Sequence, residues 1–498
     1  MQYQAVVGLE VHVQLKTRTK IFCRCLNLFG AEPNTLVCPV CAGYPGSLPV
    51  LNREAVNLAV RLALALGCRV NPHSTFARKN YFYADLPKGY QISQFAEPVA
   101  TGGALPLTHH AKRVAIHRLH LEEDAGKLLH ETPGGGALPG QSLVDLNRCG
   151  VPLVEIVSAP DLASAAEAQD YLQTLHQVLL YTGTSDGNME EGSLRCDANV
   201  SVRPAGRAEL GTKVEVKNLN SFRNLAKSIE YEVERQIGRV ESGQAVVQET
   251  RTFDAALGVT RPMRGKEEAH DYRYFPEPDL PPLVLQSERV ASLVRALPEL
   301  PWERRSRFEA EYGLSVDDAR LLASTPELAS YFEAAVRHHA KNPKAVANWV
   351  MTEVLREAKT SRAALAEALP PDRLAGLVRL VDDGALSGRG AKEVLSAIWG
   401  RGEEPADAMA RLGLAQVRDE GEIADWIGAV LREHPGPVAQ YLEGKTKALG
   451  FLVGEVMKRS SGRADPRQAG ELLRLELARI VANSEEEVAS SAQLTAPD

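Results

Sequence analysis

The sequence predicts an α+β protein in which a mixed, largely antiparallel sheet is followed by all-helical domains. Up to about Leu283, short alternating segments are separated by clusters of Gly, Pro and Asn. From about Pro301, long amphipathic stretches rich in Ala, Leu, Glu and Arg replace them, after a proline-rich junction at 275–282. Strands that come first and helices that come later indicate separate domains rather than an alternating parallel α/β fold.

Length and composition favour a soluble protein of several domains. The 498 residues exceed one compact core, so roughly two to four domains are expected. No apolar run approaches a membrane span, and no secretory signal is evident. Seven cysteines, an odd number, are typical of the reducing cytoplasm, which predicts a cytoplasmic location. The net charge of −7 does not indicate nucleic-acid binding, although it is compatible with a local basic patch.

The first predicted strand, residues 6–15, has an apolar and a polar face. Alternation puts four apolar side chains on one face, namely Leu9, Val11, Val13 and Leu15. The other face carries Glu10, His12 and Gln14. A carboxylate and an imidazole two residues apart on one face can converge on a cation. A solvated strand face is the alternative interpretation.

Two cysteine pairs follow this strand with the spacing of a structural metal site. Twelve residues separate Cys23 and Cys25 from Cys38 and Cys41. Four thiolates from two such pairs suit tetrahedral zinc. We therefore expect a zinc knuckle at 23–41 that braces the start of a larger polar site.

Acidic residues in two further predicted strands are candidates for the same polar site. An apolar run ends in Glu122, Glu123 and Asp124, which form either a solvated turn or a magnesium site. Alternation from His120 favours Glu122 as the inward acid, although strands often bend at such ends. Glu155 lies in a strand that is apolar on both sides of it, so its carboxylate should be buried and needs a partner.

Basic residues in three segments are candidates for binding the phosphates of ATP or of a substrate. Lys79 belongs to a segment, 78–90, that mixes cations with aromatic side chains. Arg195 and Lys217 lie in polar rows of two alternating segments. An ordinary packed loop is the alternative for the first segment, and cross-strand ion pairing for the other two. A helix should follow Lys217, capped at Asn220 or Ser221.

The helical part divides again near 405–413, and a tail follows. The apolar stripe of residues 445–457 is best explained by core packing. Between 441 and 468 basic side chains outnumber acidic ones, and five of them are candidates for contacting a phosphate backbone, namely Lys445, Lys447, Lys458, Arg459 and Arg463. A solvated helix end is the alternative. The sequence contains no phosphate-binding loop of the Walker type, because position 439 is alanine where the run ending in Gly444-Lys-Thr446 needs glycine.

Taken in order, these segments resemble the GatB family, the tRNA-binding and catalytic subunits of the bacterial aspartyl/glutamyl-tRNA amidotransferase. The resemblance runs nearly end to end and is carried by Gly8-Leu-Glu-Val-His-Val, Arg78-Lys-Asn-Tyr-Phe-Tyr, His120-Leu-Glu-Glu-Asp-Ala-Gly-Lys, Leu143-Val-Asp-Leu-Asn-Arg, Glu191-Gly-Ser-Leu-Arg-Cys-Asp-Ala-Asn, Lys217-Asn-Leu-Asn-Ser-Phe, Asp271-Tyr-Arg-Tyr-Phe-Pro-Glu-Pro-Asp and Gly450-Phe-Leu-Val-Gly-Glu-Val-Met-Lys.

The resemblance implies the domain organisation and the partners. It implies a cradle-shaped catalytic domain at 1–290, a helical domain at 295–407 and a YqeY-like tail at 408–480 that meets the tRNA elbow. Residues 481–498 are expected to be frayed. It also implies a heterotrimer with an amidase (glutaminase) subunit and a small third subunit.

The resemblance further implies a ligase reaction of protein biosynthesis. ATP phosphorylates the side-chain carboxylate of mischarged Glu-tRNA(Gln) or Asp-tRNA(Asn). Ammonia, released from glutamine in the amidase subunit and passed through a channel, then displaces the phosphate. The family's magnesium site maps onto Glu10, His12 and Glu123, which are therefore the expected catalytic residues, and this choice goes against the alternation that favours Glu122. Zinc is predicted from the cysteine spacing alone, because not every family member carries the four cysteines.

Two alternative functions compete with this interpretation. One is a non-catalytic, zinc-containing tRNA-binding or assembly subunit, and the other is a stand-alone ligase that uses free ammonia. A binding module has little use for so many acids beside phosphates, because they would repel RNA. The acids therefore favour the catalytic subunit.

Overall fold

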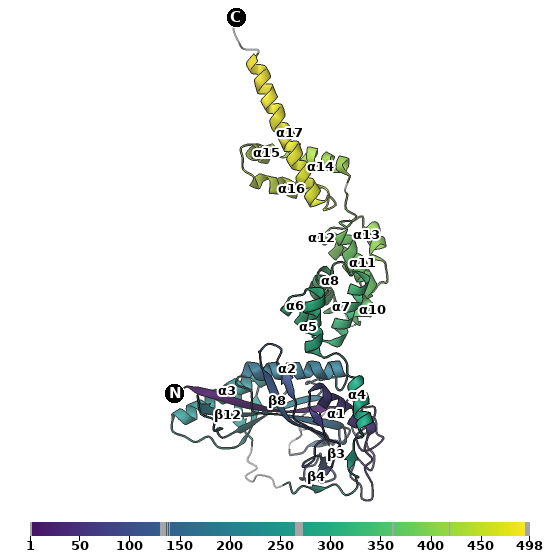
Figure 1. The fold of residues 1–498 in the computed structure, drawn as a ribbon, viewed down its shortest axis with the longest axis vertical. Coiled ribbons are helices and arrows are strands. Elements are labelled where there is room, and N and C mark those ends of the chain that lie inside the picture. Colours follow the sequence, from purple (N-terminus) through teal and green to yellow (C-terminus); the bar gives the residue numbers. More distant parts are fainter. Residues whose placement is uncertain are drawn as a thin grey trace. The chain divides into compact units, whose positions relative to one another are not determined.

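The computed structural model describes residues 2–129, 136, 138, 140–263, 272–360, 363–417 and 419–493. The chain divides into two compact units, Met1–Arg304 and Arg305–Asp498. The strands lie in the first unit, whereas the described elements of the second are helices (Figure 1). The predicted order, strands first and helices later, is confirmed.

One ten-stranded sheet forms the frame of the first unit. Its order is β15 (Val259–Pro262), β14 (Thr250–Asp254), β13 (Val214–Leu219), β12 (Leu194–Pro204), β1 (Tyr3–Gln14), β11 (Pro152–Ser158), β8 (Arg113–Glu123), β6 (Ala100–Thr101) and β2 (Arg69–Val70), with β7 (Ala104–Pro106) also paired to β8. All of these pairings are antiparallel except that of β13 with β14. The sheet is therefore mixed and largely antiparallel, as predicted.

Three small sheets surround the large one. They consist of β3 (His73–Ser74) with β17 (Leu283–Val284), of β9 (Lys127–Leu129) with β10 (Leu143–Asp145), and of β16 (Phe275–Pro276), β4 (Ala77–Asn80) and β5 (Tyr90–Ser93). The last of these brings Arg78 of β4 into contact with Glu277, at 2.8 Å between Nε and Oε2. This ion pair ties a segment near residue 80 to one almost 200 positions later.

Three of the helices that lie wholly in the first unit begin after a residue whose side chain caps them. The described helices wholly in this unit are α1 (Arg53–Ala65), α2 (Ala165–Thr182), α3 (Phe222–Glu241) and α4 (Ser287–Arg295). Asn52, Ser164 and Ser221 accept hydrogen bonds from backbone N–H groups of the first turns of α1, α2 and α3. Ser221 is one of the two caps that the sequence predicts. Gly183 ends α2 with a φ of 63°, a left-handed conformation that glycine adopts without strain.

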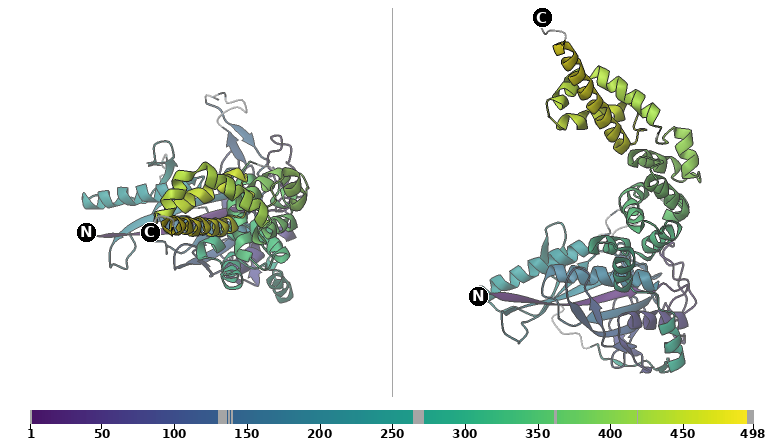
Figure 2. Two further views of the ribbon diagram at one scale, coloured as in Figure 1. Left: turned by 90° about the horizontal axis from the view of Figure 1, so that it is seen from above. Right: turned by 45° about the horizontal axis from the view of Figure 1, so that its top comes forward.

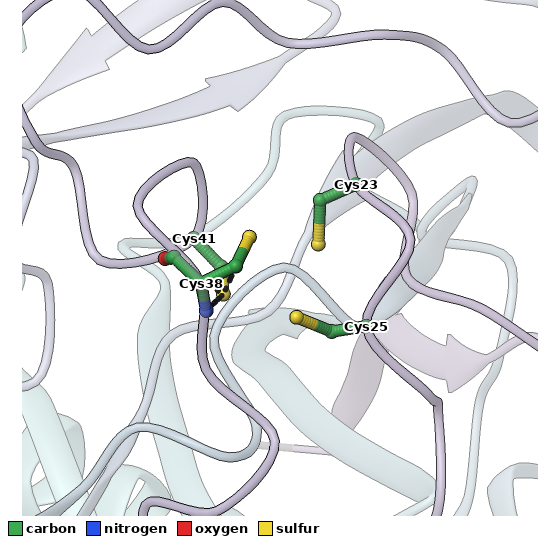
Figure 3. A group of neighbouring side chains, drawn as sticks. All are labelled: Cys23, Cys25, Cys38 and Cys41. Carbon is green, nitrogen blue, oxygen red and sulfur yellow. Dashed lines mark hydrogen bonds between the residues drawn. The ribbon is translucent and has the colours of Figure 1, made fainter.

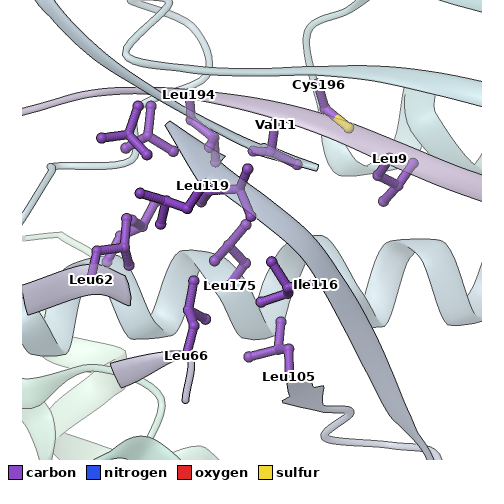
Figure 4. Packing of buried hydrophobic residues seen from close by; sticks show 14 of the residues in the cluster. Leu9, Val11, Leu62, Leu66, Leu105, Ile116, Leu119, Leu175, Leu194 and Cys196 are labelled. Atoms are coloured by element: carbon purple, nitrogen blue, oxygen red, sulfur yellow. The ribbon is translucent and has the colours of Figure 1, made fainter. Parts of the chain in front are cut away.

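The core of the first unit lies against the apolar face of β1. The four predicted inward residues of this strand are at most 1% exposed. Figure 4 shows Leu9 and Val11 of β1 near Leu119 of β8 and Leu175 of α2, and Leu62 of α1 belongs to the same cluster. Helices α2 and α3 run along one face of the sheet (Figure 1). The alternating polar residues of β1 are consequently left on the opposite face.

The second unit contains only helices among its described elements. They are α5 (Pro301–Tyr312), which starts at the boundary, α6 (Val316–Leu322), α7 (Pro326–His338), α8 (Pro343–Trp349), the π-helix η1 (Val350–Val354), α9 (Leu355–Ala358), α10 (Leu365–Ala368), α11 (Pro371–Asp382), α12 (Gly388–Ile398), α13 (Pro405–Leu412), α14 (Glu420–Glu433), α15 (Pro435–Leu442), α16 (Lys447–Arg459) and α17 (Pro466–Gln493). No described helix combines the length and apolar character that crossing a bilayer requires.

Two separate hydrophobic clusters hold these helices. One contains buried residues from Phe308 to Ala408, and the other from Ile423 to Leu477. The predicted apolar stripe of α16 enters the cluster between Ile423 and Leu477, the third of the chain, through Leu452 and Val456. The prediction that this stripe packs in a core is confirmed. Helix α17 is one continuous helix (Figure 2), so residues 481–493 are helical where fraying was predicted. Residues 494–498 lie outside the described part of the chain.

Candidate active site and metal centre

The polar face of the large sheet gathers side chains from several strands. On β1, Glu10 and His12 alternate with the buried apolar residues. His12 lies opposite Glu155 of β11 and opposite Arg195 of β12, and Glu155 in turn lies opposite His120 of β8. Directly opposed residues of an antiparallel pair point to the same face of a sheet. The pairing of the strands thus brings residues that are far apart in the sequence together on one polar surface.

Four of these side chains form an acid–histidine cluster, made of His12, His120, Glu122 and Glu155. His12 Nε2 lies 3.5 Å from a Glu155 oxygen and 3.8 Å from a Glu122 oxygen. His120 Nε2 lies 3.3 Å and 3.7 Å from oxygens of the same two carboxylates. One ligand atom each from His12, Glu122 and Glu155 lies within 4.8 Å of the others. These oxygen and nitrogen donors suit a divalent cation.

The histidines and carboxylates of the acid–histidine cluster shift one another's pKa values. Burial alone would lower the pKa of both histidines, but pairing with Glu155 and Glu122 outweighs it. The pKa of His12 is raised, and that of His120 is raised to about 9. Burial would also raise the pKa of Glu155, yet its contacts with the two histidines lower it. The prediction that Glu155 needs a partner is confirmed, although its side chain is 16% exposed and so only partly buried.

Glu10 lies beside the acid–histidine cluster on the same face. Its Oε1 accepts a hydrogen bond of 2.9 Å from Asn199. Burial and the nearby charge of Glu155 raise the pKa of Glu10. Glu10 is thus a further carboxylate close to Glu155, and a bound cation would relieve the repulsion between them.

The acidic triplet at the end of β8 points in three directions. Glu122 joins the acid–histidine cluster, whereas the carboxylate of Glu123 accepts hydrogen bonds from Lys88 and from the Ile92 N–H, the latter at 2.8 Å. Asp124 Oδ2 pairs with Arg195, at 2.9 Å. The family resemblance selects Glu123 to accompany Glu10 and His12, but the structure places Glu122 beside His12 instead. The reason is that the two-residue period of β8 continues through Glu123, so adjacent side chains take opposite faces.

The three predicted phosphate-binding residues occupy different places. Arg195 is paired with Asp124 on the polar face, and Lys217 Nζ lies 2.8 Å from Asp197 and 2.9 Å from Glu215. These are cross-strand and same-strand ion pairs of the kind that the alternative interpretation anticipates. Lys79 lies on β4, with its Nζ 4.7 Å from the centre of the Tyr272 ring. Asp271, which belongs to a motif of the family resemblance, lies outside the described residues.

The four cysteines form a second candidate metal centre. Figure 3 shows their sulfur atoms directed toward a common space, two from each of two loops. The sulfur atoms lie within 4.8 Å of one another. A hydrogen bond with Cys23 is the main cause that lowers the pKa of Cys41 to about 4. Four thiols in this arrangement fit tetrahedral zinc.

Sequence reasoning did not single out two lysines near the cysteines, Lys20 and Lys88. Lys20 is fully buried, and its Nζ donates to the Leu36 carbonyl at 2.7 Å. Lys88 and Glu123 line a pocket together with Cys23 and Cys41. A single lysine three residues before a cysteine has no diagnostic spacing, so the local pattern contains no signal that could have found Lys20.

The predicted tRNA-binding residues of the tail lie on or near α16. Lys445 and Lys458 are mostly exposed and lie near acids, at 3.3 Å from Glu443 and 3.6 Å from Glu455. Arg459 pairs with Glu433 at 2.7 Å. The remaining two are Lys447, which begins α16, and Arg463, whose guanidinium lies 5.7 Å from the Trp426 ring centre. Each basic side chain with an acid beside it offers less net positive charge to RNA.

Fold and site together define a class: a sheet-based domain whose polar face is lined by acids and histidines, followed by helical modules. Residues 5–291 match the family model described as GatB/GatE catalytic domain, and residues 330–477 match the GatB domain. The chain belongs to the GatB family of aspartyl/glutamyl-tRNA(Asn/Gln) amidotransferase subunits.

Similar proteins agree over almost the whole length. The chain is 54% identical over 477 residues to the corresponding amidotransferase subunit of Geotalea daltonii, covering 95% of this chain and 99% of the relative. It is 51% identical over 482 residues to that of Carboxydothermus hydrogenoformans, covering 96% of this chain and all of the relative. The corresponding protein of Geotalea uraniireducens is 53% identical over 477 residues, with 95% and 99% covered.

Proposed function

We propose that this chain is the subunit of a tRNA-dependent amidotransferase that activates and amidates the aminoacyl group, a carbon–nitrogen ligase. A side-chain carboxylate oxygen of Glu-tRNA(Gln) or Asp-tRNA(Asn) attacks the γ-phosphorus of ATP, and ADP leaves. Ammonia then attacks the carbonyl carbon of the acyl phosphate, phosphate leaves, and the nitrogen loses a proton. The observation that carries this proposal is the full-length similarity to the amidotransferase subunits, joined to the acid–histidine cluster of the catalytic domain.

We infer that His12, Glu122 and Glu155 hold the divalent cation, with Glu10 beside them. Bound magnesium would neutralise phosphate charge during phosphoryl transfer, which depends mainly on positioning and electrostatics. The contribution of the chain is to hold three ligand atoms within 4.8 Å of one another on a rigid sheet. His120 holds the two carboxylates from the other side, at 3.3 Å and 3.7 Å. Glu123, already engaged by Lys88, is assigned to the neighbouring pocket instead.

Arg195, Lys217 and Lys79 are proposed to contact phosphates of ATP or of the tRNA. Arg195 and Lys217 support this role because they lie on the same polar face as the cation ligands. Both are ion-paired to acids, which fixes their charged ends near the site. A phosphate would compete with these acids for the same cations.

The partners and the domains follow from the same reaction. An amidase subunit would release ammonia from glutamine, and a small third subunit would complete the heterotrimer. We propose a catalytic domain at 1–290, a helical domain at 295–407 and a tRNA-binding tail at 408–480. The separate hydrophobic clusters, which end near Leu300, Ala408 and Leu477, support these limits. Because tRNA is the substrate, a cytoplasmic location is proposed.

The cysteine cluster is proposed to bind one structural zinc ion per chain. The support is the spacing of the four cysteines and their convergence on a common space (Figure 3). A closed set of four protein ligands is typical of structural rather than catalytic zinc. Zinc would therefore tie the loop at 23–41 to the body of the catalytic domain.

The test uses the purified complex with ATP, glutamine and each mischarged tRNA. The amino acid on the tRNA is identified after the reaction. The parent complex should convert attached Glu to Gln, Asp to Asn, or both, and His12→Ala should abolish this conversion while glutamine hydrolysis continues. His73→Ala is a matched control, since His73 is about half exposed and pairs only with Glu97 among the described contacts. Normal amidation by His12→Ala would contradict the assignment.

The rival function, a non-catalytic tRNA-binding subunit, predicts the opposite result. In that case His12→Ala would reduce tRNA affinity and leave the chemistry at saturating tRNA unchanged. The acid–histidine cluster argues against it, because buried carboxylates repel a polyanion unless a cation lies between them.

A further inference from the structure

Lys20 is a buried cation with an unusual partner. It is 0% exposed, and lysine is almost never fully buried unless it is paired. Its Nζ donates to the Leu36 carbonyl at 2.7 Å and lies 3.6 Å from Cys41 Sγ. In the part of the chain that the structure describes, no carboxylate forms an ion pair with it. The sulfur of Cys41 is therefore the negative group that faces the ammonium.

The metal centre itself creates a need for positive charge. Four thiolates around one divalent ion leave a net charge of about two negative units. Charge of this size is costly to bury unless a partner compensates for it. Cys41 is the most buried of the four ligands, at 4% exposed, so solvent screens it least. An ammonium beside its sulfur removes one of the two uncompensated charges.

The Glu123 carboxylate is a second negative group close to the cysteine cluster, so a positive charge there matters more. A Cβ added to Gly150 would lie 3.6 Å from Cys41 Cβ, 3.7 Å from Lys20 Cδ and 4.0 Å from Glu123 Oε2. The cysteine cluster, the lysine and the Glu123 carboxylate therefore meet around one glycine, with no side chain from that position between them. Lys88 is already paired with Glu123. Lys20 is then the cation that contacts the cysteine cluster, while Lys88 is the cation that contacts Glu123.

We propose that Lys20 is the internal counter-cation of the tetrathiolate centre, and that it is a positioning residue that fixes Cys41 toward the metal. The proposal rests on the zinc site proposed above, and it concerns the charge of Lys20 rather than its packing. Partners that hydrogen-bond to metal ligands commonly contribute about 10- to 100-fold to metal affinity. Replacing Lys20 by a neutral residue should therefore weaken zinc binding by this factor.

The experiment measures zinc affinity of the full chain by competition with a chromogenic chelator, and the thiolate-to-metal absorption of the cobalt-loaded protein. Lys20→Gln removes the charge and keeps a hydrogen-bond donor, and Lys20→Arg keeps the charge. We expect about 10- to 100-fold weaker zinc binding for Lys20→Gln, a smaller loss for Lys20→Arg, and a shifted cobalt spectrum in the first. Lys112→Gln is the control, because Lys112 forms an ion pair of 2.6 Å with Glu167 away from the cysteines.

Two results would overturn the proposal, and they show which of its premises fails. If the parent chain binds no zinc, the zinc site itself is wrong, and amidation remains testable separately. If the parent binds zinc and Lys20→Gln binds it equally tightly, the role of Lys20 is refuted.

A second variant keeps the test decisive if Lys20→Gln does not fold. Cys25→His replaces one thiolate by a neutral ligand and so restores the charge balance without Lys20. The double variant Lys20→Gln/Cys25→His should then fold and load zinc about as well as Cys25→His. If Cys25→His folds and loads zinc but the double variant does not, Lys20 acts by packing, which contradicts the proposal.

Discussion

Protons and metal ions compete for the same atoms at the acid–histidine cluster. His12 lies between two carboxylates, 3.5 Å from Glu155 and 3.8 Å from Glu122, so its protonated form is stabilised against the effect of burial. A cation that replaces this proton would meet one nitrogen and two oxygens already in place. The site is thus poised for exchange of a proton for a divalent cation.

The first prediction concerns the pH dependence of cation binding. The pKa of His12 is raised, so below that value the proton must be expelled before a metal binds. Affinity for magnesium or manganese should therefore rise with pH up to the raised pKa of His12, which lies above the ordinary imidazole value of about 6.5, and level off beyond it. Calorimetry in buffers of different ionisation enthalpy should detect proton release on binding. A pH-independent affinity, or the same proton release from His12→Gln, would contradict this account.

Part of this site could be predicted from residues alone. The polar face with Glu10 and His12 follows from alternation, and a buried Glu155 that needs a partner follows from its apolar strand. His120 was not expected as that partner, because which strand lies beside which is decided by the sheet register and not by local spacing. The same limit applies to Lys20, whose partners Leu36 and Cys41 are 16 and 21 positions away.

At the scale of elements, β8 shows how one strand serves two sites. Its last two residues point to opposite faces, so Glu122 enters the acid–histidine cluster and Glu123 enters the pocket beside the cysteines. Alternation favoured Glu122 on the polar face, whereas the family resemblance selected Glu123 as the metal ligand. The sequence could not decide between them because a bend at the strand end would have reversed the choice. The backbone stays regular through Glu123.

Helix α3 provides a second prediction at this scale. Glu232 is 0% exposed and accepts hydrogen bonds from Arg235, Gln236 and Thr260, at 2.6 to 2.9 Å. The Arg251 guanidinium lies 3.6 Å away. Glu232 thus joins α3 to β14 and β15 through charged hydrogen bonds. Glu232→Ala would leave Arg235 and Arg251 with Glu249 as their remaining carboxylate, at 3.5 Å and 2.7 Å. Removing one partner of a buried pair costs about 3–5 kcal/mol, so we expect a loss of stability of up to this size.

Chemical denaturation of the full chain checks this value. Glu230→Ala on the exposed side of the same helix is the matched control and should change stability by less than about 0.5 kcal/mol. Equal effects of the two substitutions would mean that the buried network does not stabilise the first unit.

At the scale of the whole molecule, three hydrophobic clusters succeed one another along the chain. The sequence predicted this succession because its apolar pattern changes from a two-residue to a helical period. It did not predict that the end of the tail continues as α17 to Gln493, since polar terminal residues commonly fray. Among the side chains of this 28-residue helix that the structure describes, Leu477 is the last one that is buried in the cluster.

The third prediction concerns the tail as a unit. Truncation after about Asp407 removes the proposed tRNA-contacting residues together with the third hydrophobic cluster. Binding of mischarged tRNA by the complex should weaken, and the dependence of affinity on salt should become shallower because fewer phosphates are contacted. Glutamine hydrolysis should be unaffected. Unchanged tRNA affinity at physiological salt would contradict a role of the tail in binding.

The most direct test of the central claim is the position of a manganese ion, measured by anomalous diffraction from crystals of the complex grown with manganese and a non-hydrolysable ATP analogue. Manganese accepts the same oxygen and nitrogen ligands as magnesium and can be located by its anomalous signal. We predict a peak bonded to His12, Glu122 and Glu155, absent in His12→Gln. A peak at Glu123 and Lys88, or none on the polar face of the sheet, would contradict the account.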